Sequence, residues 1–128
     1  GVAWVLTNRS RRTTEVGDHF VAMCGFSREE IIGRKPRTLL QGPLTEGDRG
    51  TLLRSYLENM LPVSVDLTNY RKDRTLYRVH LSVFPLPDDI SEHAYLSIEF
   101  EITDKGKLTR DQRTLVYQVA EAISQFYN

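Results

Sequence analysis

Three stretches in the second half of the chain alternate between apolar and polar residues, and this pattern constrains the fold more than any other feature. They span residues 63–69, 77–83 and 94–103, and Lys72 to Thr75 has the composition of a hairpin turn. A period of two places successive side chains on opposite faces of a strand, so we expect three antiparallel strands. The face expected to point inward carries Val63, Val65, Leu67, Asn69, Tyr77, Val79, Leu81, Val83, Ala94, Leu96, Ile98, Phe100 and Ile102.

Residues 1–33 are predicted to form two short strands and two short helices. Alternation over residues 2–6 predicts the first strand, and residues 13–16 are predicted to form the second. We expect Asp18 to cap a helix that ends at Gly25 and places Cys24 in the core. A serine–x–x–glutamate capping box at 27–30 predicts the next helix.

The stretch from Gly33 to Gly42 is unusually crowded, because it holds two glycines, Pro36, three cations, two leucines and Gln41 in ten positions. Proline is favoured in the first turn of a helix and glycine permits bends, so we expect a short helical turn between two bends. Two interpretations remain open. The stretch is either a solvated connector anchored by leucines, or a turn that offers an anion the cations Arg34, Lys35 and Arg37.

Two further helices are expected. Thr45 or Asp48 is predicted to cap the first, whose apolar positions Leu52, Leu53, Tyr56, Leu57 and Met60 recur at helical spacing. Thr109 and Gln112 form a second capping box that opens a helix to Tyr127 with one apolar stripe. That stripe must cover the outer face of the sheet or meet a partner helix. The predicted fold class is α+β, with the short helices gathered on one face of the sheet.

Composition limits the function classes. The 128 residues carry 17 basic and 17 acidic side chains, so no net field draws the chain to nucleic acid or to a membrane surface. One cysteine cannot form an intramolecular disulfide, which indicates a reducing compartment, and no targeting segment is visible; we expect the cytoplasm. A phosphate-binding glycine loop, a nucleophile motif and a paired acid–base set are all missing, so we do not expect an enzyme. Asp88 with Asp89, and Glu99 with Glu101, are interpreted as solvated charges.

Several short motifs together resemble a PAS domain and are most similar to its LOV branch, the flavin-binding blue-light sensors. The resemblance covers residues 2–103 and implies a five-stranded antiparallel sheet with short helices on one face and a C-terminal amphipathic helix. The motifs are Phe20 to Gly33, Arg37, Leu40-Gln41-Gly42-Pro43, Thr45, Asn69-Tyr70-Arg71-Lys72-Asp73 and Pro85.

The resemblance also implies where a ligand would bind. Arg37 and Arg54 match LOV arginines that contact the phosphate of flavin mononucleotide (FMN). Gln41 matches a LOV glutamine near the flavin ring, and Asn69 matches the first of two LOV asparagines that bind the ring. These four are the candidate binding residues, and Val79, Leu81 and Phe100 are expected to line the pocket. Alternatives stay open, since both arginines could be solvated and Asn69 could bond the backbone instead of a ligand.

The departures from the LOV pattern bear on its chemistry. Pro36 occupies the position where LOV domains have the photoreactive cysteine, and Val79 the position of their second asparagine. The LOV glutamine that senses the photochemical state falls at or beside Phe100. A cysteinyl-flavin adduct needs a sulfur next to the ring, so this photochemistry is not expected. The cofactor is therefore unknown: FMN is possible but disfavoured, and Val79 and Phe100 could fill the pocket or accept a smaller, more apolar ligand.

Haem and metal are not expected either. Haem-binding PAS domains generally place a histidine on the helix that here spans residues 46–58, which contains none, and the three histidines form no readable metal set. We expect residues 1–104 to form the PAS domain and residues 105–128 to form a signalling or dimerisation helix. The expected module acts by binding a small ligand and by pairing into a homodimer through that helix or the sheet face, without nucleic acid or direct membrane contact.

Overall fold

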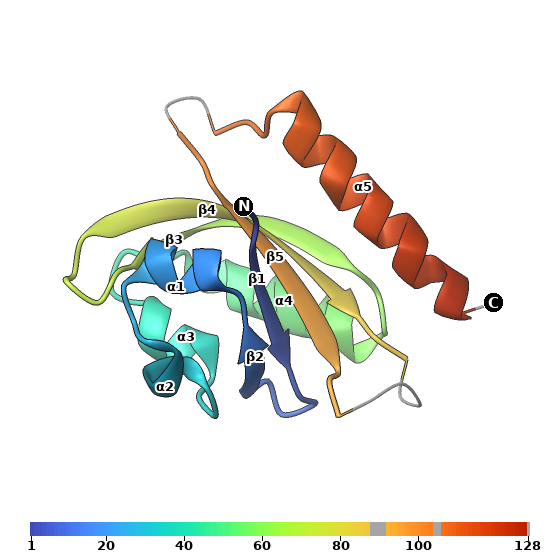
Figure 1. Cartoon of the computed structure of the whole chain (residues 1–128), viewed down its shortest axis with the longest axis horizontal. Helices are drawn as coiled ribbons and strands as arrows, with labels where there is room; N and C mark the ends of the chain where they lie inside the picture. The colour runs from blue at the N-terminus through green and yellow to red at the C-terminus, as the bar shows by residue number, and fades with distance from the viewer. Residues whose placement is uncertain (88–91, 104–105, 128) are drawn as a thin grey trace.

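A five-stranded antiparallel sheet forms the centre of the computed structural model, which describes residues 1–87, 92–103 and 106–127 (Figure 1). The strand order is β2-β1-β5-β4-β3, and every neighbouring pair runs antiparallel. The predicted strands, including the 72–75 hairpin turn, are thereby confirmed. Their bounds are β1 Ala3–Thr7, β2 Thr13–Val16, β3 Val63–Tyr70, β4 Leu76–Pro85 and β5 Tyr95–Glu101.

The helices divide between the two faces of the sheet. The four short ones gather on the inner face, as predicted, while α5 crosses the outer face (orange to red in Figure 1). Among the described residues, no helix combines the length and the apolar character needed to cross a membrane. The bounds are α1 Asp18–Cys24, α2 Arg28–Ile31, α3 Pro36–Leu40, α4 Gly47–Glu58 and α5 Arg110–Ser124, which a 3-10 turn extends over Gln125–Tyr127. Residues 88, 89, 104 and 105, on which the predicted solvated pair and the predicted domain boundary fall, lie outside the described residues.

The outer face of the sheet has an apolar cluster of its own. Phe84, Ile98 and Phe100 are buried there under the half-buried stripe of α5. Of the two roles predicted for the stripe, the structure shows the first, since the stripe covers the outer face of the sheet of its own chain. The side chains of α5 that pack on this cluster are Leu115, Val116, Val119, Ala120 and Ile123.

The inward face predicted for β5 is wrong. Phe100 and its alternate neighbours point to α5, whereas Ser97 and Glu99 point to the inner side. The register agrees, since Glu99 pairs with Leu81 on β4 and with Ala3 on β1. Because α5 buries the outer face, both faces of β5 are covered, and apolar character alone could not identify the inner one.

Two predicted helix caps are also wrong. The first helix begins after Gly17, and the Asp18 carboxylate instead forms an ion pair with Arg28. The cap of α4 is Glu46, whose carboxylate accepts hydrogen bonds from the Thr68 backbone N–H (2.8 Å) and from Arg78 (2.7 Å). These side chains find partners on other elements, which local sequence spacing does not reveal. The capping boxes at Ser27 and Thr109 are confirmed.

The spacing of apolar residues along α4 predicts a wider buried face than the structure shows. Leu53 and Leu57 are buried in the inner core, but Leu52, Tyr56 and Met60 are exposed. The inner core also contains Cys24, as predicted, with Phe20, Ile31 and the inward residues of β3 and β4. The result is a narrow contact between α4 and the sheet.

Candidate functional site

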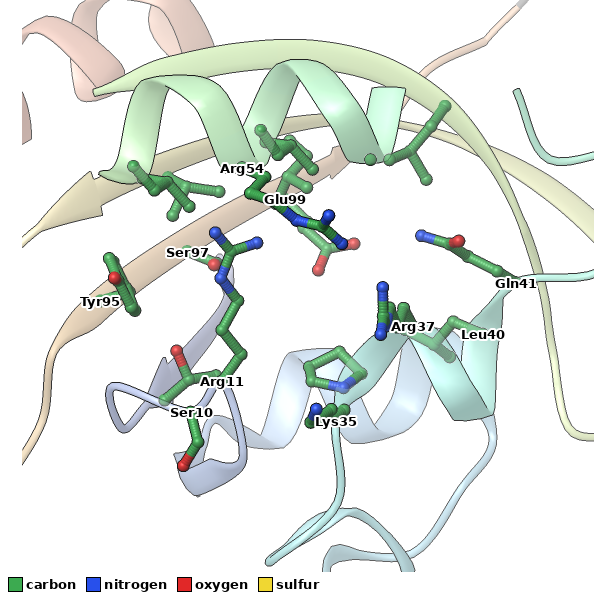
Figure 2. Close-up of a pocket in the computed structure, with 18 of the residues that line it drawn as sticks. Ser10, Arg11, Lys35, Arg37, Leu40, Gln41, Arg54, Tyr95, Ser97 and Glu99 are labelled. Carbon is green, nitrogen blue, oxygen red and sulfur yellow. The ribbon is translucent and has the colours of Figure 1, made fainter. Parts of the chain in front are cut away.

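A cavity of about 580 Å³ lies between the inner face of the sheet and helices α3 and α4 (Figure 2). Its size falls within the range of small-molecule sites. All four candidate binding residues line it: Arg37 and Gln41 around α3, Arg54 on α4 and Asn69 on β3. The sequence prediction that these positions face one pocket therefore agrees with the geometry, while their contact with a ligand stays a prediction.

Basic side chains from three elements surround the cavity, and we call them the cationic rim. Figure 2 shows Arg11 reaching in from the β1–β2 loop, Arg37 from α3 and Arg54 from α4. In the described parts of the chain, Lys35, Arg37 and Arg54 form no ion pair, so their charges remain available to a ligand. The rim consists of Arg9, Arg11, Lys35, Arg37 and Arg54.

The 33–42 stretch forms one wall of the cavity through a short helix. Pro36 is its first residue, and Gly33 has the left-handed φ of 84° that favours glycine. Backbone hydrogen bonds anchor it to β2, from the Gly33 N–H to the Thr13 carbonyl (2.8 Å) and from the Thr13 N–H to the Arg34 carbonyl (2.9 Å). Leu40 is buried and anchors this turn, as the first interpretation expects. Lys35 and Arg37 line the cavity whereas Arg34 is exposed outside it, and binding of an anion stays a prediction.

Gly42 fixes the end of this wall against the sheet. A Cβ on Gly42 would lie 2.6 Å from Cε1 of Tyr70, whose hydroxyl accepts a hydrogen bond from the Leu44 N–H (2.9 Å). We expect Gly42→Ala to lower the free energy of unfolding by about 1–3 kcal/mol, because the ring must shift. Denaturant unfolding measures this, and Gly50→Ala on α4, with open space around its Cβ, should leave stability equal or higher. Equal losses in the two variants would contradict this packing.

The sheet side of the cavity carries a buried carboxyl without a partner. Glu99 lines the cavity and is 5% exposed, and its Oε1 has no hydrogen-bond partner among the described residues. Tyr77 is buried outside the residues that line the cavity. Asn69 lies next to Tyr77 and is also buried. Burial raises the pKa of the Glu99 carboxyl to about 7 and raises that of the Tyr77 phenol strongly. The interpretation of Glu99 as a solvated charge is therefore wrong.

Cys24 lies outside the residues that line the cavity. Its thiol is fully buried and donates a weak hydrogen bond of 3.8 Å to the Val21 carbonyl. Burial raises the pKa of this thiol, which disfavours the reactive thiolate. At the turn where the resemblance places a photoreactive cysteine, Pro36 lines the cavity.

Only one of the three residues predicted as pocket lining is found there. Leu81 lines the cavity, Val79 is completely buried in the core beside it, and Phe100 lies on the opposite face of the sheet. Neither Val79 nor Phe100 fills the pocket, which is more polar than the sequence suggested. Sequence reasoning missed Glu99 and the two rim arginines of the β1–β2 loop. The sequence signal that could have identified Glu99 is a charged residue between apolar residues at 98 and 100, beside the position of the family's sensing glutamine.

The fold, the pocket and the sequence motifs together can be compared with known proteins. A family model described as a PAS domain matches residues 1–104. The chain is a PAS domain.

Sensory kinases and LOV domains are among the relatives of this PAS domain. A blue-light-activated histidine kinase of Brucella anthropi is 32% identical over 91 residues, which are 70% of this chain and 18% of that protein. A bacterioopsin transcriptional activator of Halobacterium salinarum is 28% identical over 91 residues, or 70% of this chain and 13% of that protein. The PAS domain thus spans less than a fifth of either relative.

Solved structures agree with this assignment. The LOV domain of the Erythrobacter litoralis blue-light activated histidine kinase superposes with a TM-score of 0.71 at 26% identity, over 80% of this chain and 97% of that one. The light-state structure of the Aureochrome1 LOV domain superposes with a TM-score of 0.73 at 24% identity, over 92% of this chain and 91% of that one. This likeness shows the shared fold. The PAS domain is therefore similar to LOV domains in sequence and in fold.

Proposed function

We propose that the PAS domain is the sensory input of a signalling protein and binds a small anionic ligand in its inner cavity. The observation that carries this proposal is the convergence of Arg37, Gln41, Arg54 and Asn69 on one cavity of about 580 Å³. A ligand would supply the hydrogen bond that Glu99 Oε1 lacks among the described residues, and leaving such a buried group unpaired is costly.

The charge of the lining favours an anion. The cavity is lined by the five residues of the cationic rim against two acidic residues, Glu58 and Glu99. Guanidinium groups match phosphate and carboxylate geometry, and Gln41 can donate or accept at a neighbouring position. The anionic group is expected at the rim and the rest of the ligand toward the sheet.

A cysteinyl-flavin adduct has no support in this arrangement. The chain has a single cysteine, and its buried thiol lies outside the cavity lining. We therefore propose signalling by ligand occupancy and not by formation of a covalent bond to sulfur.

The second candidate is a degenerate LOV domain that binds FMN without forming the adduct. All four positions carried over from the LOV pattern line the same cavity, and this observation favours FMN. The absorption spectrum of the freshly purified protein separates the two candidates. A structured flavin band in the blue region would establish the second and overturn the first, whereas its absence is the expected result.

Strand β5 offers a direct route from the cavity to the outer helix. Ser97 and Glu99 line the cavity, while Ile98 and Phe100 between and beside them pack under α5. A ligand that favours one position of β5 would bias the packing of α5, because a ligand shifts only states that it distinguishes. We propose that residues 105–128 carry this signal to an effector such as a histidine kinase, the activity named for one relative.

The domain is proposed to pair into a homodimer through α5 in the cytoplasm, a compartment that the single cysteine supports. Because the inner stripe of α5 covers the sheet, the outward side of the helix, where Tyr117 is 75% exposed, is the proposed contact. Light scattering should show a dimer for the whole chain and a monomer for Tyr117→Glu, which removes no buried contact. A monomeric wild-type chain would contradict the dimer.

A further inference from the structure

The loop between β1 and β2, residues 8–12, brings to the cavity a cation that the likeness to LOV domains does not assign. Arg37 and Arg54 stand at positions that the resemblance links to a phosphate, whereas Arg11 has no such match. Figure 2 shows the Arg11 side chain extending from the loop into the space that Arg37 and Arg54 approach from α3 and α4. Guanidinium groups from three separate elements therefore face the same space.

Arg11 has a backbone conformation that an arginine rarely adopts. Its φ of 66° lies in the left-handed region, which glycine and asparagine occupy at lower cost. The residue is half-buried, so part of its long side chain is withdrawn from solvent at the cavity. Strained residues of this kind persist where the surroundings fix them, and they gather at ligand-binding sites.

The contacts of the loop fix Arg11 before any ligand arrives. The Asn8 carbonyl accepts a hydrogen bond from the Arg11 N–H (2.9 Å), and Asn8 Oδ1 accepts one from the Arg12 N–H (3.0 Å). The Arg12 guanidinium donates to the Gly33 carbonyl (3.0 Å), which ties the loop to the turn before α3. The Arg11 guanidinium carbon lies 5.7 Å from the centroid of the Tyr95 ring, within the range of a cation–π contact.

The charge of Arg11 is available to a ligand. In the described ranges of the chain, Arg11 forms no ion pair, and neither do Arg37 and Arg54. A single phosphate group can pair with the forks of two guanidinium groups. A third guanidinium, delivered by a separate loop, needs further anionic oxygens beside the first group.

We propose that Arg11 forms a second anionic subsite at the rim of the cavity and selects small molecules that carry two adjacent anionic groups, as a diphosphate does. This inference rests on the proposed ligand-binding function and narrows it. The first anionic group meets Arg37 and Arg54, and the second meets Arg11. The rest of the molecule extends toward the sheet.

The first test compares inorganic phosphate with pyrophosphate, which differ by one phosphate group and carry no organic part. Calorimetry measures both affinities for wild type, R11Q and R74Q at one pH and one ionic strength, because salt screens such charges. We expect R11Q to lower the affinity for pyrophosphate by on the order of tenfold, since it removes a charge-assisted hydrogen bond. The affinity for phosphate should fall by less than about threefold, because one phosphate group pairs with the other two arginines.

Arg74 supplies a matched control on the β3–β4 hairpin. It also has a left-handed φ, of 73°, and its guanidinium carbon lies 4.8 Å from the centroid of the Tyr70 ring. Arg74 lies outside the residues that line the cavity, so R74Q should keep both affinities at the wild-type values.

A second variant separates the binding role from a role in the fold. R11G removes the guanidinium and also relieves the backbone, because glycine adopts a positive φ without strain. We expect the denaturant midpoint of R11G to rise while its affinity for pyrophosphate falls as in R11Q. A lower midpoint together with the lower affinity would mean that Arg11 acts through the fold, and would overturn the second subsite.

The remaining outcomes distinguish this inference from the proposed function. Binding of both anions by the wild type, with R11Q unchanged or weakened equally toward both, would overturn the second subsite and leave anion binding standing. Failure of the wild type to bind either anion would overturn the anion-binding function itself, and the second subsite with it.

Discussion

Replacing Glu99 with glutamine is expected to raise the free energy of unfolding at pH 8 by about 3 kcal/mol. The pKa of Glu99 is about 7 in the folded chain, against 4.5 for the unperturbed carboxyl. Below about pH 4.5 both states hold the proton and the carboxyl costs nothing extra. Between 4.5 and 7 only the unfolded state releases it, so stability falls as the pH rises. Above 7 the loss is complete, at about 1.4 kcal/mol for each unit of pKa difference.

The measurement is denaturant unfolding of wild type and Glu99→Gln between pH 4.5 and pH 8. The free energies of unfolding of the two proteins should be equal at the acidic end of this range and diverge as the pH rises. Glu101→Gln removes an ion pair on the same strand and should not become more stable than wild type above pH 7. A constant difference between wild type and Glu99→Gln across this range would show that Glu99 is solvated.

Removal of α5 is the second large effect. A chain that ends at Lys107 uncovers Phe84, Ile98 and Phe100, which are 4%, 4% and 8% exposed in the intact chain. Burial of one such side chain stabilises by about 1.5–3 kcal/mol, and α5 supplies part of the cover for all three. We expect the free energy of unfolding to fall by on the order of 3 kcal/mol and the exposed face to promote self-association.

A point variant tests the same contact in a chain of full length. Val119→Asp places a charge in the half-buried stripe of α5 and should destabilise in the same direction. Glu121→Gln, at an exposed position two residues later, is the matched control and should stay within about 0.5 kcal/mol of wild type. Unchanged unfolding of the truncated chain would mean that α5 does not cover the sheet.

Much of the fold could be predicted because its signals are local. Strict alternation located the strands, capping boxes located two helices, and Pro36 with Gly33 located the short turn of α3. The motifs shared with PAS domains also identified four residues that line one cavity. The strands, the two capped helices and the turn each depend on neighbours within a few positions of the sequence, whereas the four cavity residues follow from the family resemblance.

The errors concern features that depend on distant partners. Alternation defines two faces of β5 but does not say which one α5 covers, so the pattern alone places Phe100 in the pocket that Glu99 lines. Asp18 and Glu46 likewise find Arg28 and Arg78, which are remote in sequence. The reversed face of this single strand adds Ser97 and Glu99 to the polar lining of the cavity.

Native mass spectrometry of the freshly purified, untreated chain shows whether the cavity holds an anionic small molecule. We expect a noncovalent added mass that unfolding releases. That mass should be lost in the Arg37→Ala/Arg54→Ala double variant and kept in Arg110→Ala, which removes a positive charge on α5 instead of at the cavity. A wild-type chain that carries only its own mass, or an added mass equally present in the double variant, would contradict the binding of an anionic molecule in this cavity.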